Sequence, residues 1–230
     1  MQLRTTRTLA AVGIAATILG VGAMPASASV TTRHPVRAVH LTRAARGLAA
    51  QKARCTFEVD KRVFSLGLAR IRVGQVRHLT DAQRATEQAN IDAVSHNLET
   101  VNRPAIRNAA TRAALDVACR ATFLDNRVYA VVVPQLFLTV HGDQLGDLLD
   151  TLNANIATAK TAGKDTAAVE AVAADARAHV DAALTAISTV TAEQYNADHA
   201  AVKTVFEHAA TDLETGQALH RQAAHDLAAL

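Results

Sequence analysis

The stretch LGDLLDTLNANIATA, residues 145–159, carries the pattern that predicts the fold. Four of its large apolar residues, Leu145, Leu149, Leu152 and Ile156, recur at alternating spacings of 4 and 3. This is the seam of a helix that packs against other helices, whereas a strand would alternate every second residue. We therefore predict a long helix over 135–162, and its seam includes Leu138 and Ala159.

The same periodicity extends outward in both directions. Further helices are predicted over 42–77, 81–101, from Thr111 toward Pro134, after Asp165 and over 197–229. The connections between them are short, so consecutive helices should be antiparallel. The predicted fold class is all-α, an elongated antiparallel helical bundle with coiled-coil-like long helices.

Alanine dominates the composition. Half of the residues are hydrophobic, yet only 3% are aromatic and Trp is absent. Alanine is the strongest helix former, but it buries little area. A core of this composition needs helices that approach one another closely over long contacts.

Local signals predict where the helices end. Thr80 and Gln83 form a capping box, and Pro104 should end or kink the second helix. Gly163 should cap a helix end, with Asp165 as the next N-cap. The β-branched stretch 127–134 could be a strand by propensity. It has no partner strand, so we interpret it as a buried helix end with a kink at Pro134.

The N-terminus resembles a secretory signal. Arg4 and Arg7 precede an apolar run over 9–21, and Ala26-Ser27-Ala28 forms a cleavage site. We predict a signal peptide over 1–28, a flexible basic arm over 29–40 and a helical bundle over 41–230, with possible halves 41–133 and 134–230. The expected product is secreted or extracellular and loosely associated with the cell wall. No transmembrane span is expected in the mature chain.

Two cysteines, Cys55 and Cys119, are present. In an exported chain an even number suggests a disulfide. The bond would join the first predicted helix to the third and, in the chain-entropy model, stabilise the fold by about 4 kcal/mol.

The charges are unevenly distributed. Loss of residues 1–28 removes two arginines and no acid, so the net charge falls from +3 to +1, which argues against a nucleic-acid binder. A basic run is expected either to stay solvated or to contact an anionic partner, such as a cell-wall polymer or an envelope protein. Its residues are Arg33, Arg37, Arg43 and Arg46.

No motif for catalysis or for a cofactor is recognisable. No mature serine lies in a G-x-S-x-G motif, and no H-E-x-x-H motif occurs. An acidic ladder of Asp143, Asp147 and Asp150 is expected to be solvated, opposite the leucine seam. We expect no catalytic, cofactor or metal site, although the sequence leaves metal binding by a histidine open.

The segment DNRVYAVVVPQ, residues 125–135, is similar to a segment of a known family. With the cap at 79–82, the turn at 162–165 and the helix start at 195–198, it resembles uncharacterised secreted helical proteins of high-GC Gram-positive bacteria, which carry an RVYAL-x-x-P-type segment. The resemblance implies the fold and export, and it carries no established activity. A packing or ligand segment is expected here, with Arg127, Tyr129, Pro134 and Phe137.

The leading hypothesis is a secreted, non-enzymatic structural or interaction protein of the cell envelope. One alternative is a carrier of a small apolar ligand in the region of 128–137. Another is an enzyme whose histidines and carboxylates come together from different helices. The partner, the oligomeric state and the packing order of the helices are not readable from the sequence.

Overall fold

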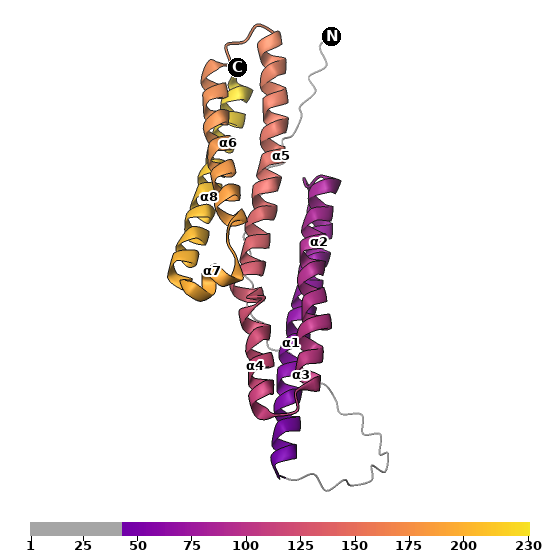
Figure 1. Ribbon diagram of the computed structural model, residues 1–230. Helices are drawn as coiled ribbons and strands as arrows, with labels where there is room; N and C mark the ends of the chain where they lie inside the picture. The colour runs from indigo at the N-terminus through magenta and orange to yellow at the C-terminus, as the bar shows by residue number, and fades with distance from the viewer. Residues whose placement is uncertain (1–42) are drawn as a thin grey trace, which may run out of the picture. The chain divides into compact units, whose positions relative to one another are not determined.

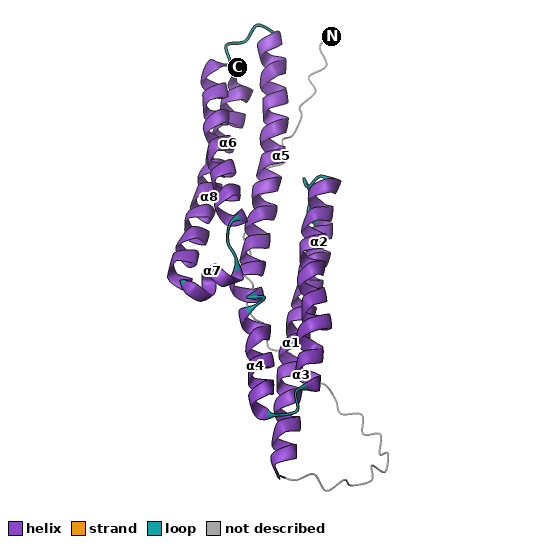
Figure 2. Ribbon diagram, in the orientation of Figure 1, coloured by secondary structure: helices purple, strands orange, loops and turns teal. Residues whose placement is uncertain are grey.

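The computed structural model describes residues 43–230, so the predicted signal peptide and basic arm lie outside the described residues (Figure 1). Every regular element in this range is helical (Figure 2), which confirms the all-α prediction. The α-helices are α1 (Arg43–Gln75), α2 (Asp81–Asn97), α3 (Arg103–Asn108), α4 (Arg112–Leu124), α5 (Val133–Thr161), α6 (Ala167–Ser188), α7 (Ala192–Ala197) and α8 (His199–Ala229). Two π-helical turns, η1 (Leu98–Asn102) and η2 (Val128–Val132), precede α3 and α5.

Six long helical runs correspond to the six predicted helices. They are α1, the run from α2 through η1 to α3, α4, the run of η2 and α5, α6, and α8. The chain reverses between α1 and α2, between α5 and α6, and again between α6 and α8, where short α7 makes the turn (Figure 1). The antiparallel bundle is therefore confirmed.

Two apolar cores follow one another along α5. The first joins α1 to α4 with Leu136 and Val140 at the start of α5. The second begins at Leu145 and joins the rest of α5 to α6 and α8. A small third cluster of Val131, Val190 and Val202 lies beside α7. The predicted division of the bundle at residue 133 stays a prediction.

The contact between α6 and α8 is built from small residues. Ala173, Ala176 and Ala183 of α6 are buried, as are Ala209 and Ala223 of α8. A Cβ on Gly216 would lie 3.1 Å from the carbonyl oxygen of Ala176, which shows how closely the backbones approach. The sequence predicts a seam of α8 that consists of Phe206, Ala210, Leu213, Gln217, His220, Ala224 and Leu227. Phe206, Leu213, Ala224 and Leu227 do pack in the second core. The prediction missed Ala209, Gly216 and Ala223, which are buried because α8 turns its smallest side chains toward α6.

Each helical proline follows a π-turn. The Arg103 amide donates to the carbonyl of Leu98, and the Val133 amide donates to that of Val128, so the backbone widens directly before Pro104 and Pro134. Proline has no N–H, and its ring clashes with the carbonyl four residues earlier in a regular α-helix. The wider turns accommodate both prolines, so the chain stays helical through Pro104 as far as Asn108.

The helix end that the sequence predicted at 127–134 is wrong, because this stretch begins a helix and the break lies earlier. α4 ends at Leu124, and Arg127 has a φ of 38°. The left-handed region is rare for residues other than glycine, and here it separates α4 from η2. Beside the break, the buried Asn126 amide donates to the Asn102 side chain over 3.1 Å and so links it to η1.

The predicted caps hold with one exception. The Thr80–Gln83 capping box is present, and Gly163 has a φ of 78° at the end of α5. The N-cap of α6 is Thr166 rather than Asp165, whose carboxylate accepts from the Ala167 amide instead.

Candidate docking surface

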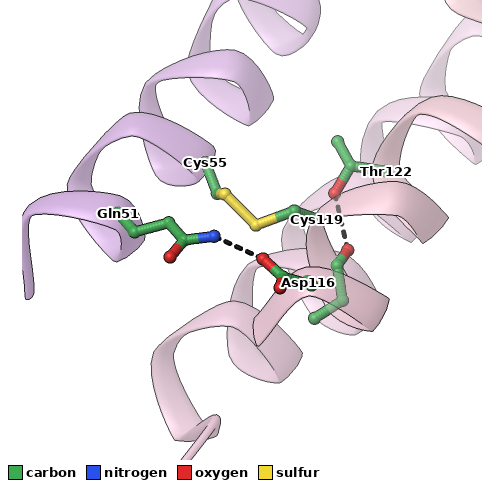
Figure 3. The surroundings of a disulfide bond; sticks show 6 residues. Gln51, Cys55, Asp116, Cys119 and Thr122 are labelled. Carbon is green, nitrogen blue, oxygen red and sulfur yellow. Dashed lines mark hydrogen bonds between the residues drawn. A yellow bond between two sulfur atoms is a disulfide. The ribbon is translucent and has the colours of Figure 1, made fainter. Parts of the chain in front are cut away.

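A disulfide joins α1 to α4 and positions one surface of the first core. Cys55 and Cys119 form the predicted disulfide, and their Cα atoms are 5.6 Å apart (Figure 3). One turn earlier on each helix, the Gln51 amide donates to the Asp116 carboxylate. Because disulfides persist in oxidising compartments, the bond suggests that the protein works in such an environment.

A second apolar row runs along α1, away from its buried face. Phe57, Phe64, Leu68 and Ile71 are 60%, 60%, 43% and 58% exposed. Their spacings of 7, 4 and 3 residues align them on one side of the helix at 100° per residue. The core side chains Val59, Leu66 and Val73 occupy the opposite side. α1 therefore presents large apolar side chains in two directions, and the other described helices cover only one of them.

Two aromatic side chains outside α1 adjoin this row. Phe123 of α4 and Phe57 line one hollow of about 210 Å³ with Cys55. The hydroxyl of Tyr129 lies 3.0 Å from that of Ser65 on α1. The buried Arg62 guanidinium holds both rings, at 4.2 Å from the Phe123 centroid and 5.3 Å from that of Tyr129.

We call this surface the apolar face of α1; it consists of Phe57, Phe64, Leu68, Ile71, Phe123 and Tyr129.

Cations accompany the apolar face. Arg46, Arg54 and Arg72 are exposed on α1, and no carboxylate among the described residues pairs with them. Of the four arginines expected to contact an anionic partner, Arg33 and Arg37 lie outside the described residues. Arg43 begins α1, and its side chain is not described, which leaves Arg46 as the one that the structure places.

The segment that was expected to pack or to bind a ligand connects the end of α4 to α7. The Arg127 guanidinium stacks 5.0 Å from the Tyr195 ring of α7, and its Nε donates to Asn196. Asn196 in turn donates to the Leu124 carbonyl at the end of α4. The two stretches that carried the family resemblance at 127 and 195 thus meet in space. Tyr129 belongs to the apolar face, Pro134 is half-buried at the start of α5, and Phe137 is 42% exposed.

A cleft of about 430 Å³ separates α2 from the first turns of α5, with Val94, Gln135 and Thr139 among its lining residues. Glu87 in its wall is only 7% exposed. Burial, with the negative charge of Asp143 on α5, raises the pKa of Glu87, and the Asn90 hydrogen bond opposes this shift. Burial likewise raises the pKa of Asp143, against a hydrogen bond from Gln83. Glu87 lines this cleft, whereas Asp143 lines a separate hollow beside Gln83. Both carboxyls therefore have a raised pKa where α2 meets α5.

The acidic ladder is solvated only in part. Asp150 stays exposed, as predicted, and pairs with Arg177 of α6. Asp147 is half-buried, 3.4 Å from the His78 ring, and Asp143 is half-buried toward α2. The prediction was wrong for Asp143, because α2 packs beside this end of α5.

Two half-buried histidines lie apart from this cleft. Burial lowers the pKa of His141 and of His220, where α5 meets α8. Within residues 43–230 no three histidine, cysteine, aspartate or glutamate side chains are grouped as metal ligands would be. In the same part of the chain, no helix combines the length and apolarity that a membrane span needs.

The sequence reasoning missed the apolar face, although the row at Phe57, Phe64, Leu68 and Ile71 is visible as a second heptad-like pattern on the same helix. It also missed the pair of Glu87 and Asp143, for which no sequence signal exists. Comparison with protein-family models, curated proteins and solved structures found no match to this chain.

Proposed function

We propose that the protein is a secreted, non-enzymatic interaction protein of the cell envelope, and that the apolar face of α1 is its docking surface. The observation that carries the proposal is the placement of the aromatic residues. Three of the five phenylalanines, Phe57, Phe64 and Phe123, lie exposed on this face, whereas the largest fully buried side chains are all leucine, isoleucine or valine. Aromatic side chains normally supply large buried area, and an exposed apolar patch marks an interaction site.

The predicted signal peptide and the disulfide support export. A bundle cross-linked between α1 and α4 is suited to an oxidising compartment. The cross-link also holds Phe123 beside Phe57, so the docking surface does not depend on the weak packing of alanine alone.

Fractionation of the host cells tests this proposal. We expect the wild-type protein to sediment with the cell envelope and the Phe64→Ser/Ile71→Ser variant to be released into the medium. Val117→Ser is the matched control, because Val117 is 70% exposed on a different side of α4 from Phe123. Equal retention of all three proteins would remove the docking role, and an intact precursor inside the cell would remove the export.

A second candidate, a carrier of a small ligand, is favoured by the cleft between α2 and α5. Its wall includes Val132, Gln135 and Leu136 from the segment that the sequence suggested. The cleft volume of about 430 Å³ is within the range of small-molecule sites. Native mass spectrometry of protein purified from its host should then show an added mass that is lost on unfolding, and a clean apo mass would contradict this candidate.

A further inference from the structure

We propose that the apolar face of α1 docks on an anionic lipid surface. This inference rests on the proposed function and names its partner. Phe57, Phe64, Leu68 and Ile71 would enter the boundary between headgroups and acyl chains. Arg46, Arg54 and Arg72 of the same helix would contact lipid phosphates.

The row has the dimensions of an interfacial contact. From Phe57 to Ile71 it extends about 21 Å along the helix at 1.5 Å per residue. Interfacial helices bury phenylalanine and leucine side chains about 5–10 Å deep while basic residues stay at the headgroups. The α1 row differs from a free amphipathic helix because its other side is already held by the first core. No folding of the helix has to accompany binding.

The charges on α1 favour an anionic surface. The only two acidic residues of this helix are Glu58 and Asp60. Glu58 pairs with both Lys61 and Arg62, and Asp60 pairs with Arg103. Of the other cations, Arg62 is buried, Lys52 is half-buried and Arg70 pairs with Asp92 of α2. Arg46, Arg54 and Arg72 remain as exposed cations without a carboxylate partner among the described residues. The potential beside the apolar row is therefore positive.

The same charges oppose the simplest competing occupant. A second copy docked on this face would place one basic α1 against another, and like charges at close range repel. An acidic helix of another protein would satisfy the charges as well as a lipid does. That possibility is an outcome of the test below.

Binding to vesicles of defined composition tests the proposal. Oxidised protein is mixed with vesicles of phosphatidylcholine, either alone or with phosphatidylglycerol, and bound protein is separated by flotation. We expect binding to the anionic vesicles that is about tenfold or more stronger than to the neutral ones and that weakens as salt is added.

Two pairs of variants separate the apolar contribution from the charge contribution. Phe64→Ser/Ile71→Ser should weaken binding about tenfold or more, because two inserted side chains are lost, whereas Val117→Ser should bind like the wild type. Arg54→Gln/Arg72→Gln should weaken binding about tenfold at low salt. Lys203→Gln/Arg221→Gln removes the same net charge from exposed sites on α8 and should have no effect.

Three results would overturn the lipid assignment. The first is that the protein does not bind the anionic vesicles. The second is that Phe64→Ser/Ile71→Ser binds them as tightly as the wild type. The third is that the wild type is a dimer in analytical ultracentrifugation and that this variant is a monomer. If cell envelopes retain the protein through this face while vesicles do not, the docking function survives and its partner is a protein or a wall polymer. If neither depends on the face, both proposals fail.

Discussion

Removal of the disulfide should destabilise the first core by an amount that its loop length sets. Cys55 and Cys119 are 64 residues apart in the sequence. In the chain-entropy model, closing a loop of this length stabilises the fold by about 4 kcal/mol. Small domains have a free energy of unfolding of about 5–15 kcal/mol, so the bond contributes a large part of the total.

The perturbation is the Cys55→Ala/Cys119→Ala variant, and the assay is urea unfolding followed by far-ultraviolet circular dichroism. With a denaturant slope of about 2 kcal/mol per molar urea, the midpoint should fall by about 2 M. Reduced wild-type protein is the control, because it keeps both sulfurs and lacks only the cross-link. Its midpoint should coincide with that of the variant.

Hydrogen exchange then shows where the stability was lost. The bond joins α1 to α4 inside the first core, whereas α6 and α8 belong to the second. Exchange in the variant should therefore accelerate in α1–α4 before it does in α6 and α8. An unchanged midpoint in both reduced protein and variant, or an earlier loss of protection in α6 and α8, would refute this reasoning.

Three further predictions follow from single positions. Gly67→Ala should raise the free energy of unfolding by about 0.5–1 kcal/mol, because a Cβ there meets nothing within 4 Å and alanine is the better helix former. Gly216→Ala, its matched control, should show no such gain in urea unfolding because the added Cβ meets the Ala176 carbonyl; equal gains would contradict the close α6–α8 approach. Glu87→Gln should raise the midpoint of urea unfolding at pH 7. This increase in the midpoint should become smaller as the pH falls through the range in which carboxyl groups titrate. The raised pKa of Glu87 means that the folded wild type holds its proton more tightly than the unfolded chain and loses stability as the pH rises between the two pKa values. A variant less stable than the wild type at pH 7 would contradict this sign, and Glu193→Gln at an exposed site is the control. Arg127→Ala should lower the melting temperature, because it keeps the left-handed backbone and loses the contacts to Tyr195 and Asn196; an unchanged melting temperature would show that α7 does not depend on this anchor.

The sequence predicted only part of the candidate docking surface. The cysteine pair could be predicted because an even cysteine number in an exported chain indicates a bond. The basic run pointed to the N-terminal part of α1 but not to the apolar face beside it. α1 carries two apolar rows, and the periodicity of one helix does not say which row neighbouring helices cover.

Glu87 and Asp143 show a second limit of prediction from the sequence. Both are acidic residues on amphipathic helices, and for such residues the expected place is solvent. Their burial arises because α2 and α5, more than 30 residues apart in the chain, pack side by side. Neither the burial nor the raised pKa has a local cause, so no local pattern could reveal it.

The sequence by itself determined that the chain is helical, where most helices begin and end, and that two cysteines pair. These properties depend on hydrogen bonds and side chains within a few residues of one another, as at the Thr80 cap and Gly163. Only the tertiary structure decided which row of α1 stays exposed, which side of α8 meets α6, and that the break lies at Arg127 rather than at Pro134. Each of these depends on the shapes and charges of segments distant in the chain, because burial is a property of the assembled helices and not of any one of them.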